Sequence, residues 1–208
     1  MLFAVIGNID GNDRALNAAL DAIEEEGIHT ILHTGNAAAG APGGNEVLAL
    51  LERSGVICVQ GNTDRLTVRY SRKQDTLDRK MDGDLLHAVR HAHESLTSQN
   101  LETLRDWRKS RTITLEGIAV YVCHGAPGSP REILAPDTPL MKMQRLREIA
   151  RADIIVCGGA ERPFSRLVDG ALFVAPGPIE DGSGSVARYT LVNTEERPWV
   201  AVEQSIAL

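Results

Sequence analysis

Three short apolar runs near the N-terminus are each followed by a loop rich in glycine and asparagine and then by a helix-like segment. The runs are Leu2–Ile6, residues 30–33 and residues 56–59. Residues 12–26 and 46–53 carry apolar side chains at helical spacing. Because repeated strand–loop–helix units pack as a parallel or mixed sheet with helices on its faces, the expected class is α/β (α+β).

The segment at about residues 65–110 differs from the units before it. It is charged, contains three histidines and lacks strand-like runs. This composition predicts two or three helices laid over one end of the sheet, and so over any site at that end. His87 and His91 are spaced four residues apart there and could hold a metal, but a solvated helix face is the favoured explanation of the spacing.

Strand-like runs return at residues 111–115, 119–123 and 153–156. Before the last of them, Thr138-Pro139 predicts a helix that begins with a threonine cap and runs to about residue 151. The tail, from residue 171 to residue 204, alternates and turns like antiparallel strands. With 208 residues and 43% hydrophobic content, the chain is expected to form one domain over residues 1–208.

Composition excludes several classes of function. The net charge is −6, no strongly basic run occurs and aromatic residues make up only 4%, so binding to a nucleic-acid backbone is not expected. No apolar run is long enough to span a membrane, and the apolar N-terminus lacks the basic start of a signal peptide. The odd number of cysteines, three, predicts reduced and packed thiols and a cytoplasmic protein.

Five polar loops come directly after apolar runs, and they are the candidate site. They comprise residues 7–12, 33–36, 61–64, 123–125 and 158–161. In open α/β sheets, ligands bind in crevices beyond the ends of the strands. We therefore expect the five loops to converge on one face and to form a single site.

The ordered set of loops resembles the calcineurin-like metallophosphoesterases. The family pattern runs Asp-x-His, Gly-Asp, Gly-Asn-His/Cys-Asp, His-Gly and Gly-His-x-His, and the likeness covers nearly the full chain. The likeness is greatest to the small bacterial branch of phosphodiesterases and diadenosine-tetraphosphatase-like hydrolases. The resemblance implies a four-layer α/β/β/α sandwich whose two central mixed sheets are flanked by helices.

The resemblance also implies roles for individual residues around two divalent metals, usually Mn, Fe, Zn or Mg. The first metal would be held by Asn8, Asp10, Asn36 and Glu161, and the second by Asn36, Asn62, His124 and the residue at position 159, which is Gly159; Asn36 would bridge both metals. His124 and Asn62 would be the catalytic residues. Substrate or phosphate contacts would come from Asn12, Gly35, Thr63, Asp64 and Gly125.

Several of these positions depart from the family pattern. Two cations about 3.5–4 Å apart repel each other and need anionic ligands between them. Asn36 offers a neutral carbonyl where the family has a bridging aspartate, and Asn8 likewise replaces a charged carboxylate with a neutral amide. Gly159 has no side chain that could bind a metal. A metal is therefore expected to bind weakly or not at all.

Three interpretations of the site remain open. In the first, the two-metal site is weakly active or inactive, and the pocket is kept for binding. In the second, one metal is held by Asp10, Glu161 and neutral oxygens near His124, and such hard ligands favour Mg, Mn or Ca. In the third, two metals still bind weakly and hydrolysis is slow.

Structural roles explain the same residues without any metal. Asparagines at positions 8 and 36 cap turns well, and Asp10 could do the same. His124 could be an ordinary hydrogen-bonded histidine, and Glu161 could pair with Arg162. Residues 62 and 64 could brace neighbouring loops. Tight turns would explain glycines 7, 11, 35, 61 and 125.

Two classes of function follow from these alternatives. As an enzyme, whose activity the sequence leaves uncertain, the protein would be a metal-dependent phosphoesterase acting on phosphodiesters, phosphomonoesters or dinucleoside polyphosphates, with the loop around Arg131 shaping specificity. As a binding protein, it would be a non-catalytic phosphate- or nucleotide-binding or scaffold protein. The expected partners are a phosphate ester or nucleotide small molecule and a second copy of the chain in a homo-oligomer.

Overall fold

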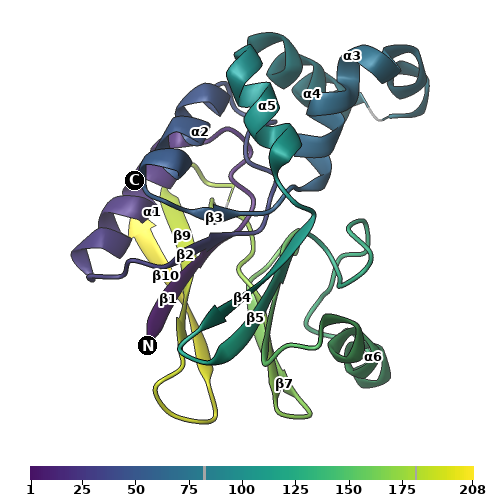
Figure 1. The fold of residues 1–208 in the computed structure, drawn as a ribbon. Helices are drawn as coiled ribbons and strands as arrows, with labels where there is room; N and C mark the ends of the chain where they lie inside the picture. The colour runs from purple at the N-terminus through teal and green to yellow at the C-terminus, as the bar shows by residue number, and fades with distance from the viewer. Residues whose placement is uncertain (82, 181) are drawn as a thin grey trace.

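The computed structural model describes residues 1–81, 83–180 and 182–208, and within them the strands form two five-stranded mixed sheets (Figure 1). The first sheet has the order β10-β9-β1-β2-β3. Its strands are β1 (Leu2–Ile6), β2 (Ile31–His33), β3 (Ile57–Cys58), β9 (Val186–Asn193) and β10 (Val200–Ala207). The three N-terminal strands run parallel, as expected, and β9 is antiparallel to both β1 and β10.

The second sheet has the order β4-β5-β6-β8-β7. Its strands are β4 (Ser110–Leu115), β5 (Ile118–Cys123), β6 (Ile154–Cys157), β7 (Phe164–Val168) and β8 (Ala171–Ala175). The inner strands β5, β6 and β8 run parallel, and the edge strands β4 and β7 are antiparallel to their neighbours.

The two sheets pack face to face, and helices cover their outer faces, which confirms the four-layer sandwich. Alternation along β1 shows how the layers form. Phe3 and Val5 enter the core between the sheets, whereas Ala4 and Ile6 pack beneath α1 (Asp13–Glu25) and α2 (Gly44–Arg53). In the second sheet, alternate residues of β6 pack against α6 (Leu140–Ala150) on the opposite outer face.

Three helices follow β3 and group at one end of the sandwich (Figure 1). They are α3 (Asn62–Lys80), α4 (Gly83–Ser95) and α5 (Ser98–Asp106). A small apolar cluster joins Tyr70 of α3 and Val89 of α4 to Ala39, in the loop after β2. The charged segment is therefore helical, as expected, and is tied by packing to a loop of the candidate site.

Three local predictions were wrong. Thr138 does not cap α6, because the cap position is Pro139 and the Thr138 hydroxyl instead accepts a hydrogen bond from the Ala135 amide at 2.9 Å. Strand β7, with its alternating polar and apolar residues, was not predicted. The strand β8 is parallel to β6 rather than part of an antiparallel tail, because burial on both faces makes it an inner strand.

Two expectations about composition can be compared with the structure. The three cysteines are free and buried, as predicted for reduced and packed thiols. Within the described ranges, no helix is long and apolar enough to cross a membrane.

Candidate functional site

Hydrogen bonds and close contacts connect the loops that follow the parallel strands. The carbonyl of Asn36, after β2, accepts hydrogen bonds from the amides of Ile9 and Asp10, after β1, at 3.0 Å each. A Cβ on Gly158, after β6, would lie 2.7 Å from Cβ of Thr34. Loops from both sheets thus meet at one place, the carboxyl end of the parallel strands.

His124 links the two sheets within this site. It follows β5, is 2% exposed, and its Nδ1 lies 2.9 Å from the carbonyl oxygen of Thr34. Burial lowers the pKa of His124 below its usual value, although the Thr34 carbonyl opposes the change. Because a carbonyl only accepts, Nδ1 carries the proton, and the neutral ring keeps the Nε2 lone pair for a ligand or a donor.

Asp64 is fully buried and holds two loops together. Its carboxylate accepts hydrogen bonds at 2.8 Å from the backbone amides of Asn36, Ala37 and Gly61. Burial raises the pKa of Asp64, and the three amides oppose that shift. Since the side chain is 0% exposed and both oxygens are engaged, we infer that Asp64 braces the loops rather than touching a ligand.

Asn36 is also engaged with its neighbours. Its φ is 63°, in the left-handed region that asparagine tolerates better than most residues. Its Oδ1 accepts a hydrogen bond from the amide of Thr63, in the first turn of α3, at 3.0 Å. The oxygen at the bridging position therefore completes the start of a helix and has one lone pair left.

Asn8 and Asp10 lie next to each other in the first loop. The Oδ1 of Asn8 is buried and has no hydrogen-bond partner among the residues the structure describes. Burial and the neighbouring Asp64 raise the pKa of Asp10 to about 7, and a hydrogen bond from the Asn8 side chain opposes the shift. The loop thus contains an unpaired acceptor and a carboxyl group that is partly protonated near neutral pH.

Asn62 begins α3 and is paired with an arginine of the same turn. Nη2 of Arg65 donates to Oδ1 of Asn62 at 3.1 Å. Burial, followed by the positive charges of Arg69 and Arg131, lowers the pKa of Arg65. A guanidinium therefore contacts the oxygen that the resemblance assigns to the second metal.

The remaining predicted site residues, Asn12, Thr63 and Glu161, differ in burial and in hydrogen bonding. Asn12 caps α1 by accepting from the amide of Ala15 at 3.0 Å. Thr63 is buried, and its hydroxyl has no partner within the described part of the chain. Glu161 is exposed. Among residues 1–81, 83–180 and 182–208, no group of three or more His, Cys, Asp or Glu side chains could hold a metal ion.

Two loop glycines are needed for close approach rather than for a turn. A Cβ on Gly7 would lie 1.5 Å from the Gly177 carbonyl oxygen, and one on Gly61 would lie 2.2 Å from the Asn36 nitrogen. Neither glycine has a positive φ, so the expected tight-turn explanation fails for them. It holds for the left-handed glycines Gly11, Gly35 and Gly125.

The structure adds residues that the motifs did not single out. His33 ends β2, is fully buried, and lies edge-on to Trp107 with ring centroids 5.9 Å apart. Burial and the neighbouring His124 lower the pKa of His33 to about 3, so the ring is neutral. Its place as the first residue of the second loop was its only sequence signal, and nothing in the sequence pairs Arg65 with Asn62.

The three histidines of the helical segment, His87, His91 and His93, do not form one cluster. His87 and His91 of α4 are exposed, whereas His93 lies with Nδ1 2.9 Å from the carbonyl of Thr67. The solvated-helix interpretation accounts for the exposed pair.

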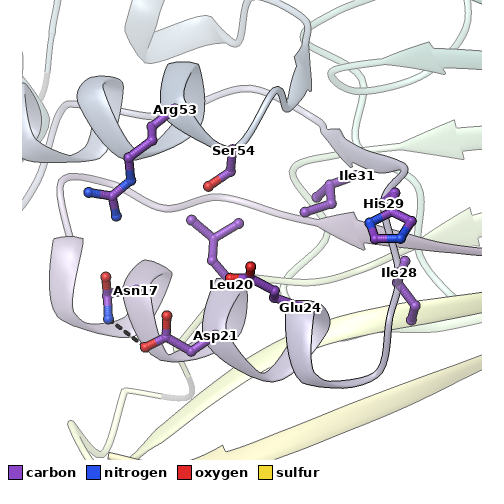
Figure 2. Close-up of a pocket in the computed structure, with 9 residues that line it drawn as sticks. All are labelled: Asn17, Leu20, Asp21, Glu24, Ile28, His29, Ile31, Arg53 and Ser54. Atoms are coloured by element: carbon purple, nitrogen blue, oxygen red, sulfur yellow. Dashed lines mark hydrogen bonds between the residues drawn. The ribbon is translucent and has the colours of Figure 1, made fainter.

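A separate cavity of about 390 Å³ lies between α1, α2 and the start of β2 (Figure 2). Its lining includes Asp21, Glu24, His29 and Arg53 over an apolar floor, and none of the predicted site residues lines it. It adjoins the amino end of β2, whereas the candidate site lies beyond the carboxyl end, so the two are distinct.

Comparisons with known proteins agree with this architecture. A sequence model of the calcineurin-like phosphoesterase superfamily domain matches residues 1–197. A search of curated proteins found no match. A hypothetical protein of Pyrococcus horikoshii OT3 has a similar structure, with a TM-score of 0.82 and 22% identity over 97% of this chain and 87% of that one.

Two further structures are similar at lower identity. A metallophosphoesterase of Sphaerobacter thermophilus aligns with a TM-score of 0.73 and 16% identity over 99% of this chain and 88% of that one. Vps29 of Entamoeba histolytica, solved in complex with Zn²⁺, aligns with a TM-score of 0.53 and 15% identity over 100% of this chain and 99% of that one. At these identities the likeness establishes the fold alone.

Proposed function

The chain belongs to the calcineurin-like phosphoesterase superfamily, and we propose that its site binds a phosphate ester but is weakly active or inactive as a two-metal hydrolase. The observation that carries this proposal is the hydrogen bond from Arg65 to Asn62 Oδ1. A fixed positive charge at a ligand oxygen disfavours a second cation in the same place.

The other ligand positions support the same conclusion. The Asn36 oxygen already accepts a hydrogen bond from the Thr63 amide. A side chain at Gly159 would meet Cδ1 of Ile133 at 2.4 Å. The donor set therefore does not fit two divalent ions, which need anionic ligands between them.

A single metal is the second candidate, and one observation favours it. The unpaired Oδ1 of Asn8 lies beside the Asp10 carboxyl group, and His124 presents a neutral ring nitrogen within the same group of loops. These residues would hold one divalent ion of the oxygen-preferring kind. Such an ion would polarise a phosphoryl oxygen.

The test is elemental analysis of the purified chain after incubation with Mn²⁺, together with hydrolysis of bis(p-nitrophenyl) phosphate. We expect fewer than two metals per chain and hydrolysis far below that of a two-metal enzyme of the same fold. Two metals per chain with rapid hydrolysis would overturn the proposal. One metal, lost in Asp10→Ala, would identify the mononuclear candidate.

A further inference from the structure

We propose that Arg65, Arg69 and Arg131 form a phosphate-binding site that works without a metal, with Arg65 taking the place of the second metal beside Asn62. The inference rests on the proposed function, because it concerns the same site. Beyond the proposed function, the inference names the residues that recognise the phosphate and states that this binding needs no divalent ion.

Arg65 is positioned to contact a ligand. It is half-buried in the first turn of α3, and its Nη2 is fixed by Asn62 Oδ1 at 3.1 Å. A guanidinium has five N–H donors in a planar fork, and this bond uses one of them. The other donors remain for an anion, and paired N–H groups match the geometry of phosphate oxygens.

Arg69 and Arg131 approach Arg65 from two directions. Arg69 lies four residues further along α3 and so on the same face of the helix. Arg131 belongs to a loop that folds back over the site. In that loop, the Pro130 carbonyl packs against Gly125, and Ile133 packs against Gly159, which also adjoins His124.

Among residues 1–81, 83–180 and 182–208, no carboxylate lies within ion-pair distance of these three arginines, whereas Arg90, further along the helical segment, pairs with Asp78 at 3.1 Å. Burial, followed by the neighbouring positive charges of Arg69 and Arg131, lowers the pKa of Arg65. The two smaller contributions are those expected of like charges near one another. A concentration of positive charge without ion pairs among the described residues favours an anionic ligand.

The positive surface continues beyond the site. Arg69, Arg72 and Lys73 line a cavity of about 370 Å³ on α3. Arg65 and Arg69 are about 6 Å apart along the helix axis, at 1.5 Å of rise per residue. Two linked phosphates can therefore contact both arginines, and inorganic pyrophosphate is a suitable probe.

The experiment is isothermal titration of the full chain with pyrophosphate in the presence of EDTA, for the wild type, Arg65→Gln and Arg131→Gln. Arg79→Gln is the matched control, because Arg79 lies in the last turn of the same helix and donates to the Asp75 carbonyl. We expect binding to the wild type in EDTA. Each site variant should weaken it about tenfold, as for the loss of a charge-assisted hydrogen bond, and the control should change it less than twofold.

Three outcomes would overturn the inference. They are no binding in EDTA, an equal loss in Arg79→Gln, or binding that requires Mn²⁺ and survives Arg65→Gln. Circular dichroism of each variant separates lost binding from lost folding. Metal content tests the proposed function separately. Fewer than two metals per chain with no pyrophosphate binding would reject the arginine site and leave the loss of two-metal hydrolysis standing.

Discussion

The guanidinium of Arg65 donates to Asn62 Oδ1 at 3.1 Å, so a permanent cation contacts an oxygen that the resemblance to the family assigns to metal binding. The two residues lie in the same turn of α3 and need no large rearrangement to stay together. This one pair connects the proposed weakness of two-metal catalysis with the proposed binding of an anion by Arg65.

Restoring the family's metal ligands should not suffice by itself, because Gly159 has a left-handed backbone that strains a side chain and Arg65 already contacts Asn62. The combined variant Asn8→Asp, Asp10→His, Asn36→Asp, Gly159→His and Glu161→His places a side chain where Ile133 Cδ1 lies 2.4 Å from the added Cβ, at a residue with φ of 77°. We expect measurable Mn²⁺-dependent diesterase activity only when Ile133→Ala and Arg65→Ala are added. Equal activity with and without these two additions would show that neither residue obstructs the site.

Asp64→Asn should destabilise the protein strongly. The amide side chain loses the charge and one of the acceptor oxygens that serve three backbone amides. We expect a loss of about 3 kcal/mol in the free energy of unfolding, measured by urea denaturation. Asp75→Asn, on the exposed part of α3, is the control and should change stability by less than about 0.5 kcal/mol. A small effect of Asp64→Asn would contradict the bracing role.

Asp10→Asn should stabilise the protein more at pH 8 than at pH 5. Because the pKa of Asp10 is raised to about 7, the folded state binds its proton more tightly than the unfolded chain, and stability falls as pH rises from about 4 to 7. Asparagine removes this loss, so the gain at pH 8 should exceed the gain at pH 5 by about 3 kcal/mol.

The measurement for Asp10→Asn is urea unfolding in EDTA at both pH values. Asp169→Asn controls for the backbone, because Asp169 is exposed and has a similarly left-handed φ of 46°. An equal gain at both pH values would mean that burial does not act on the Asp10 carboxyl as inferred.

Gly61→Ala should disrupt the site although its backbone conformation suits any residue. The added Cβ would lie 2.2 Å from the nitrogen and 2.3 Å from Oδ1 of Asn36. We expect destabilisation of about 3 kcal/mol and a lower thermal midpoint. Gly83→Ala, at a helix position where a Cβ meets nothing within 4 Å, should be neutral or stabilising. A neutral Gly61→Ala would show that the two loops can separate at little cost.

Much of the fold was predictable because it depends on local patterns. The periodicity of the apolar residues placed β1, α1 and α2 within one or two residues of their observed bounds. Strand β7 was missed because Ser165 and Arg166 interrupt its apolar run, and the threonine cap at Thr138 was displaced by the turn hydrogen bond to Ala135. These errors arise where a tertiary or turn contact outweighs local preference.

The sequence by itself determined where most strands lie along the chain, the loops that follow them and the family. These follow from hydrophobic spacing and from motifs in a fixed order. Only the tertiary structure decided which atoms remain for a ligand. The Asn62 oxygen accepts a hydrogen bond from Arg65, and the Asp64 carboxylate accepts hydrogen bonds from backbone amides. The Ile133 side chain fills the space beside Gly159. These interactions depend on contacts between residues distant in the chain or on side-chain conformation. The spacing of residue types along the sequence predicts neither.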